Sequence, residues 1–270
     1  MSNLCRKIGV RLTILAFAVA FLISGSAGAQ EISVAAAADL KFALSELAER
    51  YAKQTNTKVN VTYGSSGNFL AQIQNGAPFD LFFSADMEYP RKLEAAGLAE
   101  AGTLYKYAIG RIVIWTRADS NIDVTQQGWN ALTDSRVQKI AIANPGHAPY
   151  GRAAVLALQE AGIYEQVKSK LVYGENISQA AQFVQSDNAQ AGIIALSLAV
   201  SPGMKAGKRW EIPVDMYPAI EQGAILLKSA GNKVQARAFL QFVQTPDARA
   251  TLEKFGFTVP QVNMPAAGKS

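Results

Sequence analysis

Hydrophobic positions along this chain follow two alternating patterns. Short apolar runs bounded by turn residues predict strands, and apolar residues three or four positions apart predict amphipathic helices. In residues 39–53, Leu40, Leu44, Leu47 and Tyr51 form one such stripe. The predicted strands are residues 32–36, 59–63, 81–84, 139–143, 170–173 and 191–196, and the predicted helices are residues 39–53, 66–74, 89–96, 150–161, 177–186, 234–243 and 246–255. Strands that alternate with helices predict an α/β fold with mainly parallel sheets.

Two strand-like runs are longer than the others, at residues 107–116 and 220–227. A long run of this kind suits a chain that passes from one sheet to another. We therefore expect two lobes, with residues 30–110 and 222–260 in lobe one and residues 111–221 in lobe two. The last two helices are expected to pack on lobe one, and residues 261–270 to form a disordered tail.

The first 29 residues have the organisation of a secretory signal peptide. Arg6, Lys7 and Arg11 form a basic region, residues 12–23 are apolar, and a small-x-small pattern, Ala-Gly-Ala, ends at residue 29. The apolar stretch is short for a bilayer span, which needs about 20 residues. We therefore expect cleavage near residue 30 and a secreted chain. The single cysteine, Cys5, lies in this segment, so the mature chain would have no disulfide.

Charge and composition exclude several classes of function. The chain has 26 basic and 21 acidic residues, and without the basic residues of the signal segment the balance is 23 against 21, a net charge of +2. No basic run contains interleaved aromatic residues, so nucleic acid is not an expected partner, and residues 205–209 are interpreted as a solvated turn. With one histidine and no mature cysteine, a metal ion held by protein ligands is not expected either.

Four predicted strand-to-helix junctions share one chemistry, with small or hydroxyl residues where a helix begins. They are Ala37-Ala38-Asp39 and Ser65-Ser66-Gly67 in lobe one, and Pro149-Tyr150-Gly151 and Asn176-Ile177-Ser178 in lobe two. The first N–H groups of a helix have no partner inside the helix and carry the positive end of its dipole. Because ligands of open α/β sheets bind at the carboxyl ends of strands, four such junctions at one cleft would bind an anion without Lys or Arg. Four ordinary capped helices facing unrelated directions would fit the same spacing.

In sequence and order, these junctions resemble the molybdate-binding periplasmic protein family. The resemblance rests on Ala-Ala-Asp-Leu-Lys-Phe-Ala from Ala37, Gly-Ser-Ser-Gly from Gly64, the segment 72–86, Pro149-Tyr150-Gly151 and the ending Gly-Phe-Thr-Val at 256–259. It covers nearly the whole mature chain. It implies a two-lobed type II periplasmic binding protein that binds a molybdate or tungstate dianion between its lobes. The protein would act in the periplasm as a monomer, without a cofactor, and deliver the anion to the membrane permease of an ABC importer.

The resemblance also implies a binding site. Ala38, Asp39, Ser66, Tyr150 and Ile177 would contact the oxyanion. The positions expected to support them are Ser65, Gly67, Gly151 and Asn176. Family members often have a hydroxyl or amide side chain at the first junction, where this chain has Ala38 and Asp39. Many also have a tyrosine at the position of Ala195, and the phenol of Tyr150 is expected to replace it.

Asp39 departs most from this pattern, because a carboxylate and a dianion repel each other. At about 4 Å and an effective dielectric constant near 20, the repulsion amounts to several kcal/mol. We therefore expect the side chain to cap the helix that begins at Leu40 and to turn away from the ligand, while its N–H donates. In the alternative, the carboxylate accepts a hydrogen bond from a protonated oxyanion such as hydrogen phosphate, which would change the specificity.

Other functions fit part of the sequence. His147 lies two residues before Pro149, near the expected cleft, so a Ser–His hydrolase is conceivable, but no Gly-x-Ser-x-Gly elbow is present. An enzyme is therefore not expected, and His147 is interpreted as a turn or cleft-rim residue. Asp80 and Asp86 are expected to cap helices or stabilise the lobe rather than to act as paired acids. A binding protein of the same fold for sulfate or phosphate would explain the lobes equally well.

Overall fold

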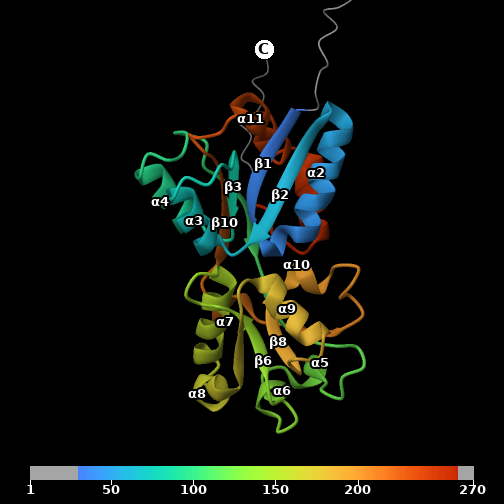
Figure 1. Ribbon diagram of the computed structural model, residues 1–270. Coiled ribbons are helices and arrows are strands. Elements are labelled where there is room, and N and C mark those ends of the chain that lie inside the picture. Colours follow the sequence, from blue (N-terminus) through green and yellow to red (C-terminus); the bar gives the residue numbers. More distant parts are fainter. Residues whose placement is uncertain (1–29, 261–270) are drawn as a thin grey trace, which may run out of the picture. The chain divides into compact units, whose positions relative to one another are not determined.

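Two five-stranded sheets with flanking helices form residues 30–260, the part of the chain that the computed structural model describes (Figure 1). The predicted signal segment 1–29, with Cys5, and the predicted tail 261–270 lie outside the described residues. Between residues 30 and 260, no helix is long and apolar enough to cross a membrane. The predicted α/β class is confirmed, although each sheet also contains antiparallel pairs.

The first sheet has the strand order β2-β1-β3-β10-β4. Strands β1 and β3 run parallel, whereas β10 is antiparallel to both of its neighbours. The last strand therefore returns from late in the sequence to lie within the first sheet, between β3 and β4. The bounds are β1 (Gln30–Ala37), β2 (Thr57–Gly64), β3 (Leu81–Ser84), β4 (Tyr105–Gly110) and β10 (Ile220–Leu226).

Side-chain alternation along these strands divides the core of the first sheet between two faces. Val34 and Ala36 pack in one apolar cluster with α2 (Lys41–Thr55), α11 (Lys233–Phe242) and α12 (Pro246–Lys254). Ala35 and Phe82 pack in another with α3 (Ser66–Gln74) and α4 (Glu88–Ala95). In Figure 1, α2 and α3 lie on opposite sides of the sheet. We call this sheet with these five helices lobe one.

The second sheet has the strand order β7-β6-β8-β5-β9, with β6 parallel to β7 and β8 and with β5 antiparallel to β8 and β9. Helices α7 (Pro149–Glu160) and α9 (Ile177–Gln185) flank β6 and β8 (Figure 1). We call this sheet and its helices lobe two. The strands are β5 (Ile112–Thr116), β6 (Ile140–Ala143), β7 (Leu171–Gly174), β8 (Ala191–Ala195) and β9 (Lys208–Glu211), and the short helices are α5 (Val124–Gln127), α6 (Asn130–Thr133), α8 (Tyr164–Val167), η2 (Lys168–Lys170), α10 (Leu196–Ala199) and η3 (Val214–Met216).

Two predictions about secondary structure are corrected. The run 107–116 is not one strand, because β4 ends at Gly110 and β5 begins at Ile112 in the other sheet. The interpretation of residues 205–209 as a turn is wrong at its end, since Lys208 and Arg209 begin β9 and pair with β5. A charged edge strand of four residues has no apolar periodicity of its own, so only its pairing with β5 reveals it.

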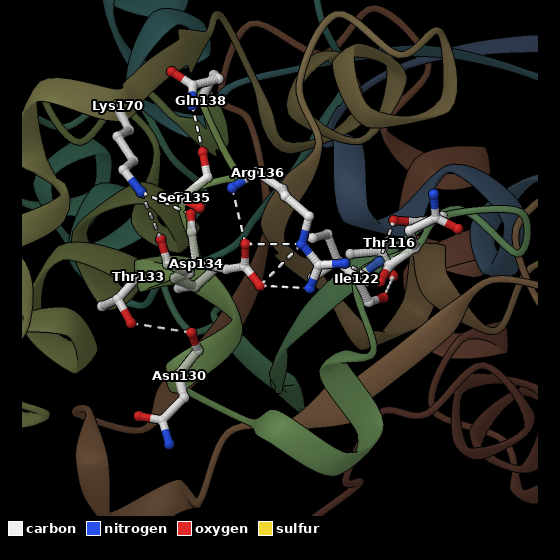
Figure 2. Close-up of polar contacts among 12 residues, drawn as sticks. Thr116, Ile122, Asn130, Thr133, Asp134, Ser135, Arg136, Gln138 and Lys170 are labelled. Carbon is white, nitrogen blue, oxygen red and sulfur yellow. Dashed lines mark hydrogen bonds and ion pairs between the residues drawn. The ribbon is translucent and has the colours of Figure 1, made fainter.

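Polar contacts fix the turn that leads into β6 (Figure 2). Arg136 donates to both carboxylate oxygens of Asp134, through Nε at 3.0 Å and Nη2 at 2.6 Å, and Lys170 donates to the Asp134 carbonyl at 3.2 Å. The hydrogen bonds from the Arg136 side chain and backbone lower the pKa of Asp134 to about 2. These contacts lie within lobe two, at the start of β6, whereas the carboxyl end of β6 leads to the loop before α7.

Candidate functional site

All four predicted junctions line one cavity between the lobes. Lobe one contributes Ala38, Asp39, Ser65 and Ser66, and lobe two contributes Tyr150, Asn176 and Ile177. The remaining lining residues are Ala37, Gly64, Ala85, Ala148 and Pro149. The four helices therefore do not face unrelated directions. None of the residues that line this cavity is Lys, Arg or His, so a ligand here would meet neutral donors and one carboxyl group.

The cavity is small, with a volume of ≈ 10 Å³ open to the centre of a water-sized sphere. By that measure one water molecule needs about 10–15 Å³. A tetrahedral oxyanion is larger than water and would require the junctions to separate. Because the junctions belong to two lobes, a hinge movement of the lobes is the expected way to make this space.

The second junction presents two serine hydroxyls that do not cap α3. Ser65 is the N-cap residue but makes no side-chain cap hydrogen bond. The Ser66 hydroxyl accepts a hydrogen bond from the Ala85 N–H at 2.9 Å, and Ser66 is fully buried. A hydroxyl that accepts in this way keeps its own hydrogen for another acceptor. Ser66 therefore has one donor to offer to the cavity, beside its own N–H at the start of α3.

In lobe two, some backbone N–H groups at the start of α9 bond to a capping side chain, and another lies at the cavity. Asn176 caps the helix, since its Oδ1 accepts from the N–H groups of Ser178 and Gln179, each at 3.0 Å. The capped N–H groups are satisfied, and the Ile177 N–H comes before them at the cavity. Asn176 thus supports the junction rather than serving as a donor itself, as the sequence predicted for a supporting position.

The two predicted supporting glycines do not line the cavity but permit close backbone approaches around it. A Cβ at Gly151 would lie 2.2 Å from the Ala143 carbonyl oxygen, so glycine lets α7 begin directly against the end of β6. A Cβ at Gly67 would lie 2.7 Å from the His147 carbonyl oxygen, to which the Gly67 N–H donates at 2.9 Å. Gly67 thus belongs to a backbone contact between the lobes.

Further hydrogen bonds from lobe two hold the first and second junctions of lobe one. Ser178 on α9 donates to the Ala38 carbonyl at 3.0 Å, and Ser197 on α10 donates to the Asp39 carbonyl at 2.8 Å. His147 Nδ1 lies 2.9 Å from the Ser65 hydroxyl. These contacts satisfy carbonyl and hydroxyl groups at the cavity rim. They place His147 at the rim of the cleft, which agrees with its interpretation as a cleft-rim residue.

The Asp39 side chain is held by a buried polar network that spans both lobes. Its Oδ2 accepts from the Tyr150 hydroxyl at 3.0 Å and from Gln222 Nε2 at 2.8 Å. Gln222 Oε1 in turn accepts from the Tyr107 hydroxyl at 2.6 Å. A Cβ at Gly110 would lie 2.1 Å from the Tyr150 hydroxyl oxygen, so a glycine at the end of β4 makes room for this phenol.

The prediction that Asp39 caps the following helix is wrong. Asp39 lies in the middle of a 3₁₀ turn, η1 (Ala38–Leu40), and neither η1 nor α2 has a side-chain cap hydrogen bond. Within residues 30–260, Asp39 Oδ1 is buried and has no hydrogen-bond partner. Burial raises the pKa of the carboxyl to about 6, although the Gln222 and Tyr150 hydrogen bonds oppose the shift, as do the nearby N–H groups of Asp39 and Leu40.

The phenols around Asp39 respond to the same burial. The pKa of Tyr150 lies well above its usual value because the hydroxyl is buried and faces the Asp39 carboxylate. Burial and the Asp39 charge shift the pKa of Tyr107 in the same direction. Both phenols therefore remain protonated donors throughout the physiological pH range.

Sequence reasoning missed several residues that organise the site. Gln222 is the clearest, because it is a fully buried amide on β10, with Ile220, Ala224 and Leu226 at the same alternation. A polar residue within an otherwise apolar set of alternate positions is a signal that could have indicated it. Ser178, Ser197 and Tyr107 carry no comparable signal. Their partners at the site, Ala38, Asp39 and Gln222, lie more than a hundred residues away in sequence, and only the fold brings them together.

The other residues weighed in the sequence have structural partners. Asp80 accepts from the backbone N–H groups of Ser33 at 2.7 Å and Asn232 at 3.3 Å, and Asp86 accepts from the Tyr89 N–H at 2.9 Å. Ala195 is buried at the N-cap of α10 and does not line the cavity. Within residues 30–260, no group of three or more His, Cys, Asp or Glu side chains could hold a metal ion.

Comparison with known proteins adds three findings. Residues 32–258 match the family model described as bacterial extracellular solute-binding protein. The chain is 38% identical over 237 residues to the molybdate-binding protein ModA of Azotobacter vinelandii, covering 87% of this chain and 93% of that protein. It is 36% identical to the molybdate-binding protein ModA of Rhodobacter capsulatus, covering 91% and 94% respectively.

The fold also matches solved structures. The periplasmic molybdate-binding protein of Azotobacter vinelandii superposes with a TM-score of 0.80 at 34% sequence identity, covering 85% of this chain and all of that chain. The expected two-lobed fold of type II periplasmic binding proteins is thereby confirmed.

Proposed function

This chain belongs to the bacterial extracellular solute-binding protein family, and we propose that it captures molybdate and delivers it to an ABC importer. The observation that carries the proposal is the convergence of four strand-to-helix junctions on one cavity whose lining includes serine hydroxyls and helix-start N–H groups but no cation. Such donors suit an anion that needs many fixed hydrogen bonds. Relatives of this chain are named molybdate-binding proteins, which supports this choice of anion.

In the proposal, Ser66 donates through its hydroxyl, and Ala38, Asp39, Tyr150 and Ile177 donate through backbone N–H groups. Ser65, Gly67, Gly151 and Asn176 hold these donors in place. Neutral donors discriminate by geometry, because a smaller anion leaves some of them unpaired at a cost of about 1–3 kcal/mol each. The chain performs no catalytic step and needs no cofactor in this function.

Several finer features complete the proposal. Tungstate is nearly equal to molybdate in size and charge, so the same site would bind both anions. Residues 1–29 would direct the chain to the periplasm and be removed. The mature protein would act as a monomer and pass its anion to a membrane permease. The contacts between the lobes, such as Gly67 to His147, would open to admit the anion and form again when the lobes close on it.

One observation favours a second candidate, a tetrahedral oxyanion that carries a proton. Asp39 lines the cavity and its Oδ1 has no hydrogen-bond partner in the described residues, so it would accept a hydrogen from hydrogen phosphate. A site of donors alone would reject such an anion, because its hydrogen needs an acceptor. Sulfate carries no such hydrogen, so the Asp39 carboxylate would not favour it. Only the size of sulfate would decide how well it competes with molybdate for the site.

Isothermal titration of the ligand-free protein with molybdate, tungstate, sulfate and phosphate at pH 7.5 tests the proposal. We expect one-to-one binding of molybdate and tungstate and no heat of binding with the other two. Binding of phosphate or sulfate in place of molybdate would assign a different anion to the same fold. Absence of binding to all four would refute oxyanion capture. Small-angle scattering should show compaction when molybdate is added.

A further inference from the structure

The two carboxyl oxygens of Asp39 differ in their hydrogen bonds. Its Oδ2 accepts two hydrogen bonds, from Tyr150 and from Gln222. Its Oδ1 is buried and accepts none from the described residues. Asp39 and Tyr150 line the cavity, but Gln222 does not. Both donors therefore hold Oδ2, and Oδ1 is the carboxyl oxygen of this cavity-lining residue that has no donor of its own in the described residues.

The surroundings of Asp39 supply no positive charge. Lobe two faces it with the phenol of Tyr150 on α7, and β4 and β10 face it with Tyr107 and Gln222. The α3 junction contributes the Ser66 hydroxyl to the same cavity, and Ser197 on α10 bonds the Asp39 carbonyl. The main influences on the pKa of its carboxyl are burial and hydrogen bonds from Gln222, Tyr150 and nearby backbone N–H groups, and none of them is a Lys, Arg or His. An ionised Asp39 beside a dianion would thus be two like-charged groups in one buried site.

We propose that Asp39 takes up one proton from solvent when the oxyanion binds and donates it from Oδ1 to an oxygen of the anion. This inference rests on the proposed function. The step is a protonation of the carboxylate followed by one hydrogen bond, so no covalent bond of the anion is made or broken. Oδ2 remains the acceptor for Tyr150 and Gln222, and the formerly unpartnered oxygen becomes a donor like the others at the site.

Two physical effects act in the same direction on this proton. Burial already raises the pKa of Asp39 to about 6 in the protein without ligand. A bound dianion raises it further, because a like charge disfavours the ionised form. Near pH 8 the carboxyl would therefore be ionised in the free protein and protonated in the complex. The dissociation constant should then rise by about tenfold for each pH unit above 6, since one proton is taken up with each anion.

Isothermal titration with molybdate at pH 8 in buffers of different ionisation enthalpy measures the proton uptake directly. We expect about one proton per anion for the wild-type protein. Asp39→Asn keeps the shape of the side chain, and its amide can accept from Tyr150 and Gln222 while its NH₂ donates toward the cavity. This variant should bind molybdate with no proton uptake, with an affinity independent of pH and tighter than wild type at pH 8.

His147→Gln is the matched control, because the chain has a single histidine and it lies at the cavity rim. Histidine side chains change charge between pH 5 and 8 and could take up a proton on closure. The uptake should persist in His147→Gln. If Asp39→Asn does not fold, infrared difference spectra of the wild-type protein serve instead, with a protonated carboxyl band expected on addition of molybdate.

The outcomes separate this inference from the proposed function. Molybdate binding with no proton uptake and a pH-independent affinity would overturn the role of Asp39 and leave anion capture standing. Uptake that survives in Asp39→Asn, or disappears in His147→Gln, would overturn it as well. Failure of both the wild-type protein and Asp39→Asn to bind molybdate or tungstate between pH 5 and 8 would refute the proposed function itself.

Discussion

Nη2 of Arg152, on α7 in lobe two, lies 2.6 Å from Oδ2 of Asp86 in lobe one. The same guanidinium donates to the Tyr89 hydroxyl at 2.9 Å and covers the Tyr89 ring at 5.4 Å. The other oxygen of the Asp86 carboxylate accepts from the Tyr89 N–H, and this bond within lobe one orients the carboxylate toward Arg152. This group of three side chains joins the lobes outside the anion cavity.

Replacing Arg152 with Met should weaken molybdate binding by favouring separation of the lobes. The ion pair is partly exposed, with 35% of the Arg152 side chain accessible, so we expect a loss of about 1 kcal/mol, or about fivefold in affinity. Stopped-flow measurement should show the change in the dissociation rate rather than in the association rate.

Arg136→Met is a matched control for that variant, because Arg136 forms the same kind of pair with Asp134 inside lobe two (Figure 2). It should leave molybdate dissociation at the wild-type rate. Equal effects of the two variants would contradict a role for Arg152 in joining the lobes.

Gly67→Ala should weaken both molybdate binding and stability. The added Cβ would lie 2.7 Å from the His147 carbonyl oxygen of the opposite lobe, so closure would be obstructed and molybdate affinity should fall at least tenfold. Gly67 is inside α3 without a positive φ, where alanine is favoured over glycine by up to about 1 kcal/mol. The clash is already present in the ligand-free structure, so the melting temperature without ligand should fall despite this preference. Gly231→Ala, where a Cβ meets no atom within 4 Å, should change neither quantity.

Ser66→Ala should reduce both stability and binding, for different reasons. Without the hydroxyl, the Ala85 N–H loses its acceptor in a buried position, which costs about 1–3 kcal/mol of unfolding free energy. Loss of the Ser66 donor should also reduce the rise in melting temperature that molybdate produces. Thermal unfolding with and without molybdate measures both effects. A variant that is less stable but shows the full rise with molybdate would remove Ser66 from the binding donors.

Asp39 should make the unfolding free energy of the ligand-free protein depend on pH. The pKa of its carboxyl is raised from 3.8 to about 6 in the folded state, so the folded protein holds the proton more tightly than the unfolded chain. This contribution to stability is complete below pH 3.8 and is lost as the pH rises to 6. At 1.36 kcal/mol per pKa unit, the loss is about 3 kcal/mol.

Urea unfolding of wild type and Asp39→Asn at pH 4, 5, 6 and 7 checks this dependence. Asparagine has no charge to bury, so the variant should gain stability relative to wild type as the pH rises toward 6 and keep that advantage at pH 7. A difference in unfolding free energy that stays constant from pH 4 to pH 7 would exclude a raised pKa for Asp39.

The local features of the site were predictable from the sequence. The helix of residues 66–74 and the strand of residues 81–84 have the predicted bounds, because apolar spacing and turn residues are properties of neighbouring positions. The four junctions follow from the same local signals. Seven of the nine predicted site residues line the cavity, and the other two, Gly67 and Gly151, permit backbone contacts beside it.

Only the tertiary structure decided how the side chains at this site are used. The sequence places Asp39 at the start of a helix, which predicted a cap, but the residues that hold its carboxyl lie 111 and 183 positions away, at Tyr150 and Gln222. Hydrogen bonds over such separations depend on how two sheets meet, and no local pattern encodes that. The sequence by itself thus determined which helix starts present anion donors. The way the two lobes meet decided that Asp39 is buried at the cavity, with hydrogen bonds to only one of its two carboxyl oxygens.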